Sequence, residues 1–364
     1  MIKFINKFIK FFIQHKFYKN YFNKNHFSLY LGDATYHNLG DKMLFLAIKK
    51  LLSPIVLIPK TPKISRYQAL NSITDVFIQA MFKGFKSCDS ILLGGGTLLN
   101  NNNYCYMLNQ VKYDLFFMFG PGFEDHEDFD NVLKYRKIFI NSVFNGVRDG
   151  HAQKMLKSCG IDSVVIGDPV LSLCTPITKT NISNRIGINI GYDAFTIGDQ
   201  MTFFDELYKF MRYLLKNNWK IEFFSMNSRD DEEIYAFLNK YKISRIKVWN
   251  NYQNINEFIN KVKDYDVIIG QRLHSVVVAC GLSIPCISIN YQTKCLHFME
   301  SMKMEKYVVN MDSFMYSYLT NAFNNLIDDY YTINKNLISS SKYYKEMQLQ
   351  SAHFVYSSIV NYKK

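Results

Sequence analysis

No two of the seven cysteines are spaced as a Cys-x-x-Cys pair, and their number is odd. Structural zinc sites and disulfide frameworks depend on such pairs or on an even, regular set of cysteines. Most of these cysteines also lie among apolar neighbours, as Cys280 does after Val278 and Ala279. The pattern argues against zinc and disulfides and predicts buried, reduced thiols in a cytosolic protein.

The first 26 residues lack both acidic side chains and an uninterrupted apolar run. Without such a run, and without a small-residue cleavage site, a secretory signal is disfavoured. Lysines instead alternate with phenylalanines and isoleucines, so that the two kinds of side chain fall on opposite sides of a helix. The segment 1–26 is therefore predicted to be a basic amphipathic helix that lies on an anionic membrane surface. The alternative is that its apolar face docks on the protein body.

The excess of basic residues is concentrated in that same segment. Lys and Arg outnumber Asp and Glu by 43 − 31 = 12, and the six lysines of residues 1–26 supply half of this excess. The remainder of the chain is only mildly basic, which argues against a nucleic-acid partner. With 48% hydrophobic and 20% charged residues the chain is expected to be globular, and 364 residues suit two domains.

Short β-rich runs alternate with helical patterns from residue 27 onward, and this alternation predicts parallel sheets covered on both faces. A stretch with little apolar periodicity, residues 174–185, separates two such series. We therefore expect an α/β protein with two doubly wound, Rossmann-like domains that face a cleft, over residues 27–178 and 179–364, the second with a helical tail. The expected strands are 27–31, 55–58, 90–93, 115–119, 163–166, 186–190, 220–224, 246–248, 266–269, 285–289 and 307–309.

Polar and glycine-rich clusters follow several of these strands, where doubly wound sheets bind their ligands. Asn38, Gly40 and Asp41 form either a helix-capping turn or part of a ligand cleft. Gly94-Gly95-Gly96 either lets an anion approach the backbone or forms a close-packed turn. This run lacks the Lys-Ser/Thr of a Walker motif and the glycine spacing of the dinucleotide fingerprint.

Charged residues at two further strand ends are candidates for binding an anion. Arg148 could bind a carboxylate or phosphate through two hydrogen bonds, or could pair with its neighbour Asp149. The most informative cluster is Arg272-Leu273-His274-Ser275, at the junction of a strand and a helix. The helix dipole there favours an anion, and a histidine can transfer protons near neutral pH. Lys294 follows the next strand and is expected at the same edge of the sheet.

Three other aspartates are interpreted as structural. Asp168, in Gly167-Asp168-Pro169, is expected to cap a turn whose shape the proline fixes. Asp264 and Asp266 match a metal-binding Asp-x-Asp pair superficially, but they lead into a strand, so a solvated turn is predicted.

Taken in order, these clusters resemble the polysaccharide pyruvyl transferase family. The matching motifs are Asn38-x-Gly40-Asp41, Gly94-Gly95-Gly96, Gly120-Pro121-Gly122, Val147-Arg148-Asp149, Asp168-Pro169 and Arg272-Leu273-His274-Ser275, followed by Tyr291 and Lys294. The resemblance covers residues 28–300 and implies a fold like that of the two-domain GT-B glycosyltransferases. It also implies transfer of the enolpyruvyl group of phosphoenolpyruvate to a sugar of a surface polysaccharide or of its lipid-linked precursor. The products would be a cyclic pyruvate ketal and phosphate.

The resemblance suggests a role for each matching residue. Arg148 and Arg272 would bind the phosphate and carboxylate of phosphoenolpyruvate. His274 would be the general acid, and Asp41 or Asp149 the base for a sugar hydroxyl. The remaining substrate contacts would come from Leu273, Asn38, Gly40, Gly94, Gly95, Gly96 and Lys294. The chemistry requires no metal and no cofactor besides the co-substrate.

Two alternatives stay open. A GT-B glycosyltransferase would bind the pyrophosphate of a nucleotide sugar at the glycine-rich and Arg272 regions. A non-catalytic scaffold for polysaccharide assembly would retain its function without Arg272 or His274. For the enzyme, the basic N-terminal segment predicts a cytoplasmic protein bound peripherally to the inner face of the cell membrane.

Overall fold

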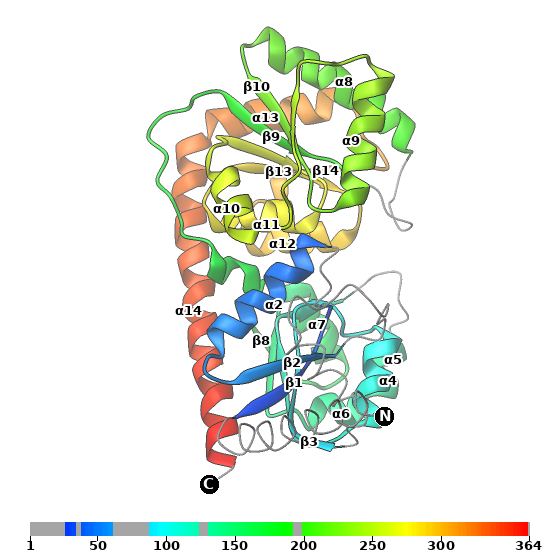
Figure 1. Cartoon of the computed structure of the whole chain (residues 1–364), viewed down its shortest axis with the longest axis vertical. Coiled ribbons are helices and arrows are strands. Elements are labelled where there is room, and N and C mark those ends of the chain that lie inside the picture. Colours follow the sequence, from blue (N-terminus) through cyan, green and yellow to red (C-terminus); the bar gives the residue numbers. More distant parts are fainter. Residues whose placement is uncertain (1–25, 34–37, 61–86, 124–129, 192–198, 363–364) are drawn as a thin grey trace, which may run out of the picture.

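The computed structural model describes residues 26–33, 38–60, 87–123, 130–191 and 199–362. Apart from its last residue, the predicted amphipathic helix 1–26 lies outside these residues. Two parallel six-stranded sheets are stacked along the long axis of the molecule, each flanked by helices (Figure 1). The predicted α/β class is therefore confirmed.

The first sheet has the strand order β2-β1-β3-β5-β7-β8. Its strands are β1 (Phe27–Leu31), β2 (Val56–Lys60), β3 (Ser87–Leu93), β5 (Lys112–Phe119), β7 (Phe144–Val147) and β8 (Val164–Val165). Two short strands pair beyond its carboxyl edge, β4 (Gly96–Thr97) and β6 (Pro121–Gly122). Although Arg148 was expected at a strand end, β7 was not among the expected strands, because Asn145 and Gly146 in its centre weaken the strand pattern.

The second sheet has the order β11-β10-β9-β12-β13-β14. Its strands are β9 (Arg185–Asn189), β10 (Lys220–Phe224), β11 (Lys247–Trp249), β12 (Val267–Gly270), β13 (Cys286–Asn290) and β14 (Val308–Asn310). All six appear within one residue of the positions expected from sequence. They are the central layer of a core made of aliphatic and aromatic side chains.

Helices cover both sheets because their apolar residues recur at helical spacing. Those following strands of the first sheet are α2 (Leu39–Leu51), α4 (Asn102–Gln110), α5 (Asp130–Lys134), α6 (Arg136–Ile140), α7 (Gly150–Ser158) and the 3-10 helix η1 (Pro169–Leu173). Those of the second half are α8 (Gln200–Lys216), α9 (Ser228–Lys240), α10 (Ile255–Lys263), α11 (Leu273–Gly281), α12 (Thr293–Ser301), the 3-10 helix η2 (Glu305–Tyr307), α13 (Tyr316–Asp328) and α14 (Tyr330–Tyr362).

Helices α2 and α14 connect the two halves. At the start of α2 the Leu39 N–H donates to the Met226 carbonyl at 3.1 Å, and the Leu39 side chain is part of the core around the second sheet. The long helix α14 runs beside both sheets (Figure 1), and its Val355 packs with Tyr30 and Phe117 of the first. These shared cores fix the carboxyl edges of the two sheets close to one another.

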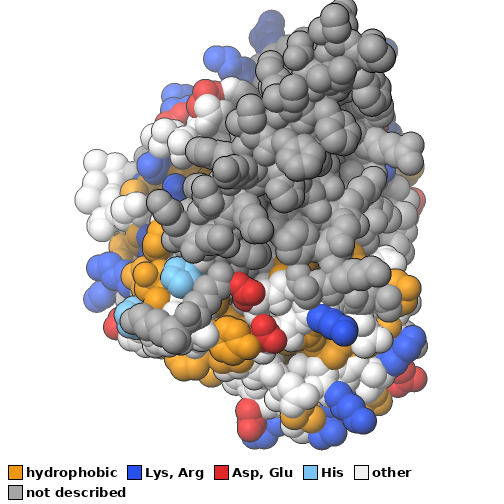
Figure 2. Space-filling view, turned by 60° about the horizontal axis from the view of Figure 1, so that its bottom comes forward, with side chains coloured by type: hydrophobic (Ala, Val, Ile, Leu, Met, Phe, Trp, Pro, Cys, Tyr) orange, Lys and Arg blue, Asp and Glu red, His pale blue; other side chains and the backbone are white. Residues whose placement is uncertain are grey.

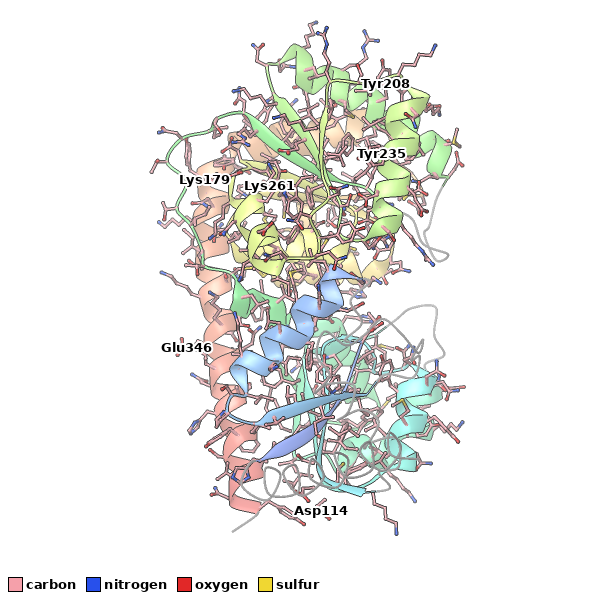
Figure 3. All side chains as sticks on the ribbon, viewed as in Figure 1. Asp114, Lys179, Tyr208, Tyr235, Lys261 and Glu346 are labelled. Carbon is pink, nitrogen blue, oxygen red and sulfur yellow. The ribbon has the colours of Figure 1, made fainter. Side chains whose placement is uncertain are left out.

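The expectation that Asp266 lies in a solvated turn is wrong. Asp266 is buried, and its Oδ2 accepts hydrogen bonds from the N–H groups of Ser183 and Arg185, in the segment that leads into β9, at 2.8 and 3.0 Å. Lys179, on the flank of the second half in Figure 3, adds an ion pair to Asp266 at 3.3 Å. Asp266 therefore anchors the connection between the halves.

Other features of the described residues bear on the expectations from sequence. All seven cysteines are buried free thiols, as predicted. On the face shown in Figure 2, Lys and Arg side chains are interspersed with Asp and Glu over the described surface. No helix in the described ranges is both long and apolar enough to cross a bilayer.

Candidate active site

A pocket of about 140 Å³ lies where the carboxyl ends of the two sheets meet. It collects residues from four of the clusters singled out in the sequence, together with the neighbouring Lys294. The lining residues are Asn38, Asp41, Gly96, Thr97, Arg148, Met226, Arg272, Leu273, His274, Tyr291 and Lys294. Arg148, Arg272 and Lys294 therefore surround Asp41, which has the one carboxyl group among the described lining residues.

Arg148 leaves the end of β7 and is almost fully buried. Its Nε donates to Asp149 Oδ2 at 3.0 Å, while Asp149 Oδ1 accepts the Ala152 N–H at 2.8 Å and so caps α7. Burial raises the pKa of Asp149, but Arg148 and this hydrogen bond outweigh it and hold the pKa below its usual value. Both oxygens of Asp149 are thus engaged, and the residue is absent from the pocket lining. Its geometry suits positioning Arg148 better than accepting a proton from a sugar.

Arg272 follows β12 and is held by a carboxylate of the second half. Its Nε donates to Asp230 Oδ1 at 2.9 Å, and its backbone N–H donates to Asn189 Oδ1 at 3.0 Å. Asp230 is fully buried and also accepts the Asn189 amide at 3.1 Å and the Met226 N–H at 3.0 Å. Asp230, Asn189 and Met226 of the second half thus together fix the orientation of the Arg272 guanidinium.

His274 lies in the first turn of α11, with its ring against the first turn of α2. A Cβ on Gly40 would lie 2.1 Å from Nδ1 of His274, so only glycine permits this contact. On the other side, Nε2 lies 3.8 Å from Asp168 Oδ2. Burial lowers the pKa of His274, Asp168 opposes this effect, and Arg148 and Lys294 reinforce it. The imidazole is therefore neutral at neutral pH.

Asp41 is placed at the pocket by the start of α2, where Asn38 Oδ1 accepts the Gly40 N–H at 2.9 Å. Burial, followed by the charge of Asp33, raises the pKa of Asp41 to about 8, although Lys294 lowers it. The carboxyl group consequently carries a proton at neutral pH. Asp41 and His274 are thus two titratable groups on one pocket, with pKa values displaced in opposite directions relative to their usual values.

The three consecutive glycines have different surroundings. A Cβ on Gly94 would lie 2.2 Å from the Tyr30 ring, and one on Gly95 would lie 2.5 Å from Leu44. These two glycines serve close packing, whereas Gly96, with φ +105°, lines the pocket together with Thr97. Gly94 and Gly95 thus form the close-packed turn that was one of the two expected alternatives, and binding of an anion at Gly96 stays a prediction.

The remaining predicted contacts, Asn38, Leu273 and Lys294, also line the pocket. Lys294 Nζ lies 5.4 Å from the centre of the Tyr291 ring, a distance typical of a cation–π contact. Sequence reasoning missed Asp230, which positions Arg272. Asp230 carries no sequence signal, because its partner Arg272 lies 42 residues away. No cluster of three metal-ligating side chains occurs within the described part of the chain.

Solved structures resemble the fold over most of its length. UDP-N-acetylglucosamine 2-epimerase from Rickettsia bellii has a TM-score of 0.57 at 13% identity, covering 93% of this chain and 97% of that one. The Methanocaldococcus jannaschii UDP-GlcNAc 2-epimerase, in complex with UDP-GlcNAc and UDP, gives 0.56 at 15%, covering 83% and 93%. The complex of MnaA from S. aureus with UDP gives 0.56 at 13%, covering 87% and 91%. No curated protein matches the chain by sequence.

Two parallel α/β halves with a polar pocket between their strand ends define a GT-B-like protein. The sequence profile that matches residues 7–293 is that of polysaccharide pyruvyl transferases. The chain belongs to the polysaccharide pyruvyl transferase family, which is a family of enzymes.

Proposed function

We propose that the pocket binds phosphoenolpyruvate and transfers its enolpyruvyl group to a sugar as a ketal. The observation that supports this most is the convergence of Arg148, Arg272 and Lys294 on one small pocket that also holds His274 and Asp41. A ligand with both a phosphate and a carboxylate needs two cationic partners, and two guanidinium groups fixed through Nε by buried carboxylates meet that need.

The proposed chemistry begins with a proton. Protonation of the enol methylene forms a C–H bond from the double-bond electrons and leaves an oxocarbenium-like C2. Two hydroxyl groups of the sugar then add at C2 and lose their protons, and the C2–O bond to phosphate breaks. His274 is the proposed general acid. Burial, followed by Arg148 and Lys294, keeps its pKa low, and binding of the anionic phosphoenolpyruvate would offset the two cations.

The other polar group of the pocket is proposed to act on the sugar. Asp41 is at the first-sheet side of the pocket, and in the donor-free protein its carboxyl group is protonated at neutral pH. It can act as a base for a sugar hydroxyl only after releasing that proton to solvent, and its ionised form increases as pH rises through about 8. With Asp149 occupied by Arg148 and the α7 cap, Asp41 is the better of the two candidates.

Calorimetric titration of phosphoenolpyruvate into wild-type protein and Arg272→Lys tests this function. Lysine keeps a charge for Asp230 but loses the planar fork of donors, so we expect binding to weaken about 10- to 100-fold. Arg212→Lys, at an exposed position on α8, is the matched control and should bind like wild type. UDP and UDP-GlcNAc serve as competing ligands, because structures with this fold bind them. Binding of UDP-GlcNAc without binding of phosphoenolpyruvate would overturn the proposal in favour of glycosyl transfer.

We also propose a sugar acceptor that is lipid-linked, at the cytoplasmic face of the membrane, because of the basic segment 1–26. Vesicles containing phosphatidylglycerol are expected to bind the full chain, less so at high salt. Deletion of residues 2–25 should abolish this binding. Replacement of Lys3, Lys7 and Lys10 by Gln removes charge but leaves the apolar residues in place, and should weaken the binding. Unchanged partition of the deleted chain onto the vesicles would refute this location.

A further inference from the structure

Asp168 and His274 face one another across the junction of the two halves. Asp168 follows β8 and caps η1 in the first half, whereas His274 begins α11 in the second. The distance from Asp168 Oδ2 to His274 Nε2 is 3.8 Å. Both atoms are buried, and neither has a hydrogen-bond partner among the described residues. A shift of less than 1 Å would bring the pair within hydrogen-bond distance.

The position of the Asp168 carboxyl group is fixed by its surroundings. Its Oδ1 accepts the Val170 N–H at 2.9 Å, and its backbone carbonyl accepts the Gln348 amide of α14 at 2.8 Å. Pro169, the next residue, packs on Gly120, whose positive φ of +80° keeps the two backbones close. The second oxygen, Oδ2, is therefore held facing the imidazole, while the capping of η1 depends on Oδ1 alone.

The imidazole is likewise confined, and its two nitrogens have different environments. Nδ1 lies against Gly40 at the start of α2, and the His274 side chain is part of the pocket lining. Nε2 is the nitrogen that is sealed from solvent, on the side of Asp168. A proton placed on Nε2 would point at a carboxylate, and this leaves Nδ1 to exchange protons with a ligand.

The charged groups around His274 come from four elements. Arg148 at the end of β7 and Lys294 on α12 disfavour a charged imidazole, and Asp168 favours it. Asp41 on α2 lines the same pocket. When an anionic ligand neutralises the two cations, Asp168 is the fixed negative charge that remains beside the ring.

We propose that Asp168 is a positioning residue that accepts the Nε2–H of His274, fixes that tautomer and stabilises the imidazolium formed when the donor binds. The inference rests on the proposed function for its role in turnover, but the pairing itself does not. In the proposed step Nδ1–H gives its proton to the enol methylene, while Nε2–H remains on the imidazole, bonded to Asp168. This corresponds to the role of the aspartate in a Ser-His-Asp triad.

The first test requires no substitution at Asp168. Histidine labelled with ¹⁵N distinguishes the two neutral tautomers by chemical shift, and the His274 signal is identified by its loss in His274→Gln. We expect the Nε2–H tautomer in the donor-free protein. The Nδ1–H tautomer would overturn the proposal, whether or not the protein binds phosphoenolpyruvate.

The second test compares Asp168→Asn with wild type, since the Asn oxygen can still cap η1. The pKa of His274, followed by the same signal, should fall by about 1 unit or more, as for loss of a nearby opposite charge. In Asp168→Asn, kcat for ketal formation should fall about 10²- to 10⁴-fold, while the dissociation constant of phosphoenolpyruvate changes less than about threefold. Asp162→Asn, on the exposed loop before β8, is the control and should leave each value unchanged. An unaltered His274 pKa in Asp168→Asn would refute the pairing. Absence of phosphoenolpyruvate binding to wild type would instead refute the proposed function.

Discussion

Replacing His274 with glutamine is expected to lower kcat for ketal formation by about 10²- to 10⁴-fold, the usual contribution of a general acid. Glutamine keeps a polar group near Asp168 and fits beside Gly40, but it cannot donate a proton at neutral pH. Because Arg148 and Arg272, the proposed contacts of phosphoenolpyruvate, remain held by Asp149 and Asp230, affinity for this ligand should change much less than kcat. Separate measurement of kcat and of the dissociation constant therefore isolates proton transfer from binding.

The pH dependence gives a second readout for the same variant. In the donor-free protein the pKa of His274 lies below its usual value because of burial, Arg148 and Lys294, so the acid form is lost as pH rises through that lowered pKa. The profile of kcat/KM in wild type should therefore fall on its alkaline side earlier than that of kcat, which reports the donor-bound state. The alkaline decrease in kcat/KM that is due to His274 should be absent in His274→Gln. His353→Gln, at an exposed position on α14, is the control. Full activity of His274→Gln would remove the imidazole from the mechanism.

The sequence predicted the strand ends of this fold well because each buried strand is a local pattern. The runs at 27–31 and 220–224 coincide with β1 and β10, since hydrophobic side chains in a parallel sheet need no alternation. In contrast, β7 is a strand because it lies between β5 and β8 rather than because of its own residues. The path of α14 from the second half back to the first sheet is also set by packing at distant residues.

The candidate site shows the same division between local and distant causes. Arg148, Arg272 and His274 could be singled out because they lie just beyond expected strand ends, at the edge of the sheet where ligands bind. The residues that hold these side chains in position could not be predicted from the sequence. Asp230 is 42 residues from Arg272, and Asp168 is over a hundred residues from His274 along the chain. Asp168 belonged to a recognised motif, yet from sequence it suggested only a turn, because its relation to His274 exists only when the halves are joined.

Among substitutions in the pocket, Asp41→Asn is expected to have the most opposed effects: greater stability than wild type at alkaline pH, and lower activity. Folding raises the pKa of Asp41 from its usual 3.8 to about 8, mainly because burial disfavours the charged form. The folded state thus holds a proton that the unfolded chain releases, and the free energy of unfolding decreases as pH rises from about 4 to about 8. Asparagine has no charge to bury, so the variant should not lose stability over this range. Its melting temperature relative to wild type should rise between pH 5 and pH 9, by roughly 1–2 °C for each kcal/mol in a chain of this length.

Activity should change in the opposite direction. Asparagine cannot accept the proton of a sugar hydroxyl, so kcat for ketal formation should fall about 10²-fold or more while phosphoenolpyruvate still binds. Calorimetric melting at pH 5, 7 and 9, with turnover measured on the same samples, tests both effects. Asp328→Asn, exposed on α13, is the matched control and should follow wild type. A pH-independent difference in melting temperature would show that the Asp41 carboxyl is already ionised at neutral pH. Unchanged turnover would show that another group activates the sugar. A carboxyl that destabilises the folded protein when it ionises, and whose loss stops turnover, would be retained for its chemistry alone.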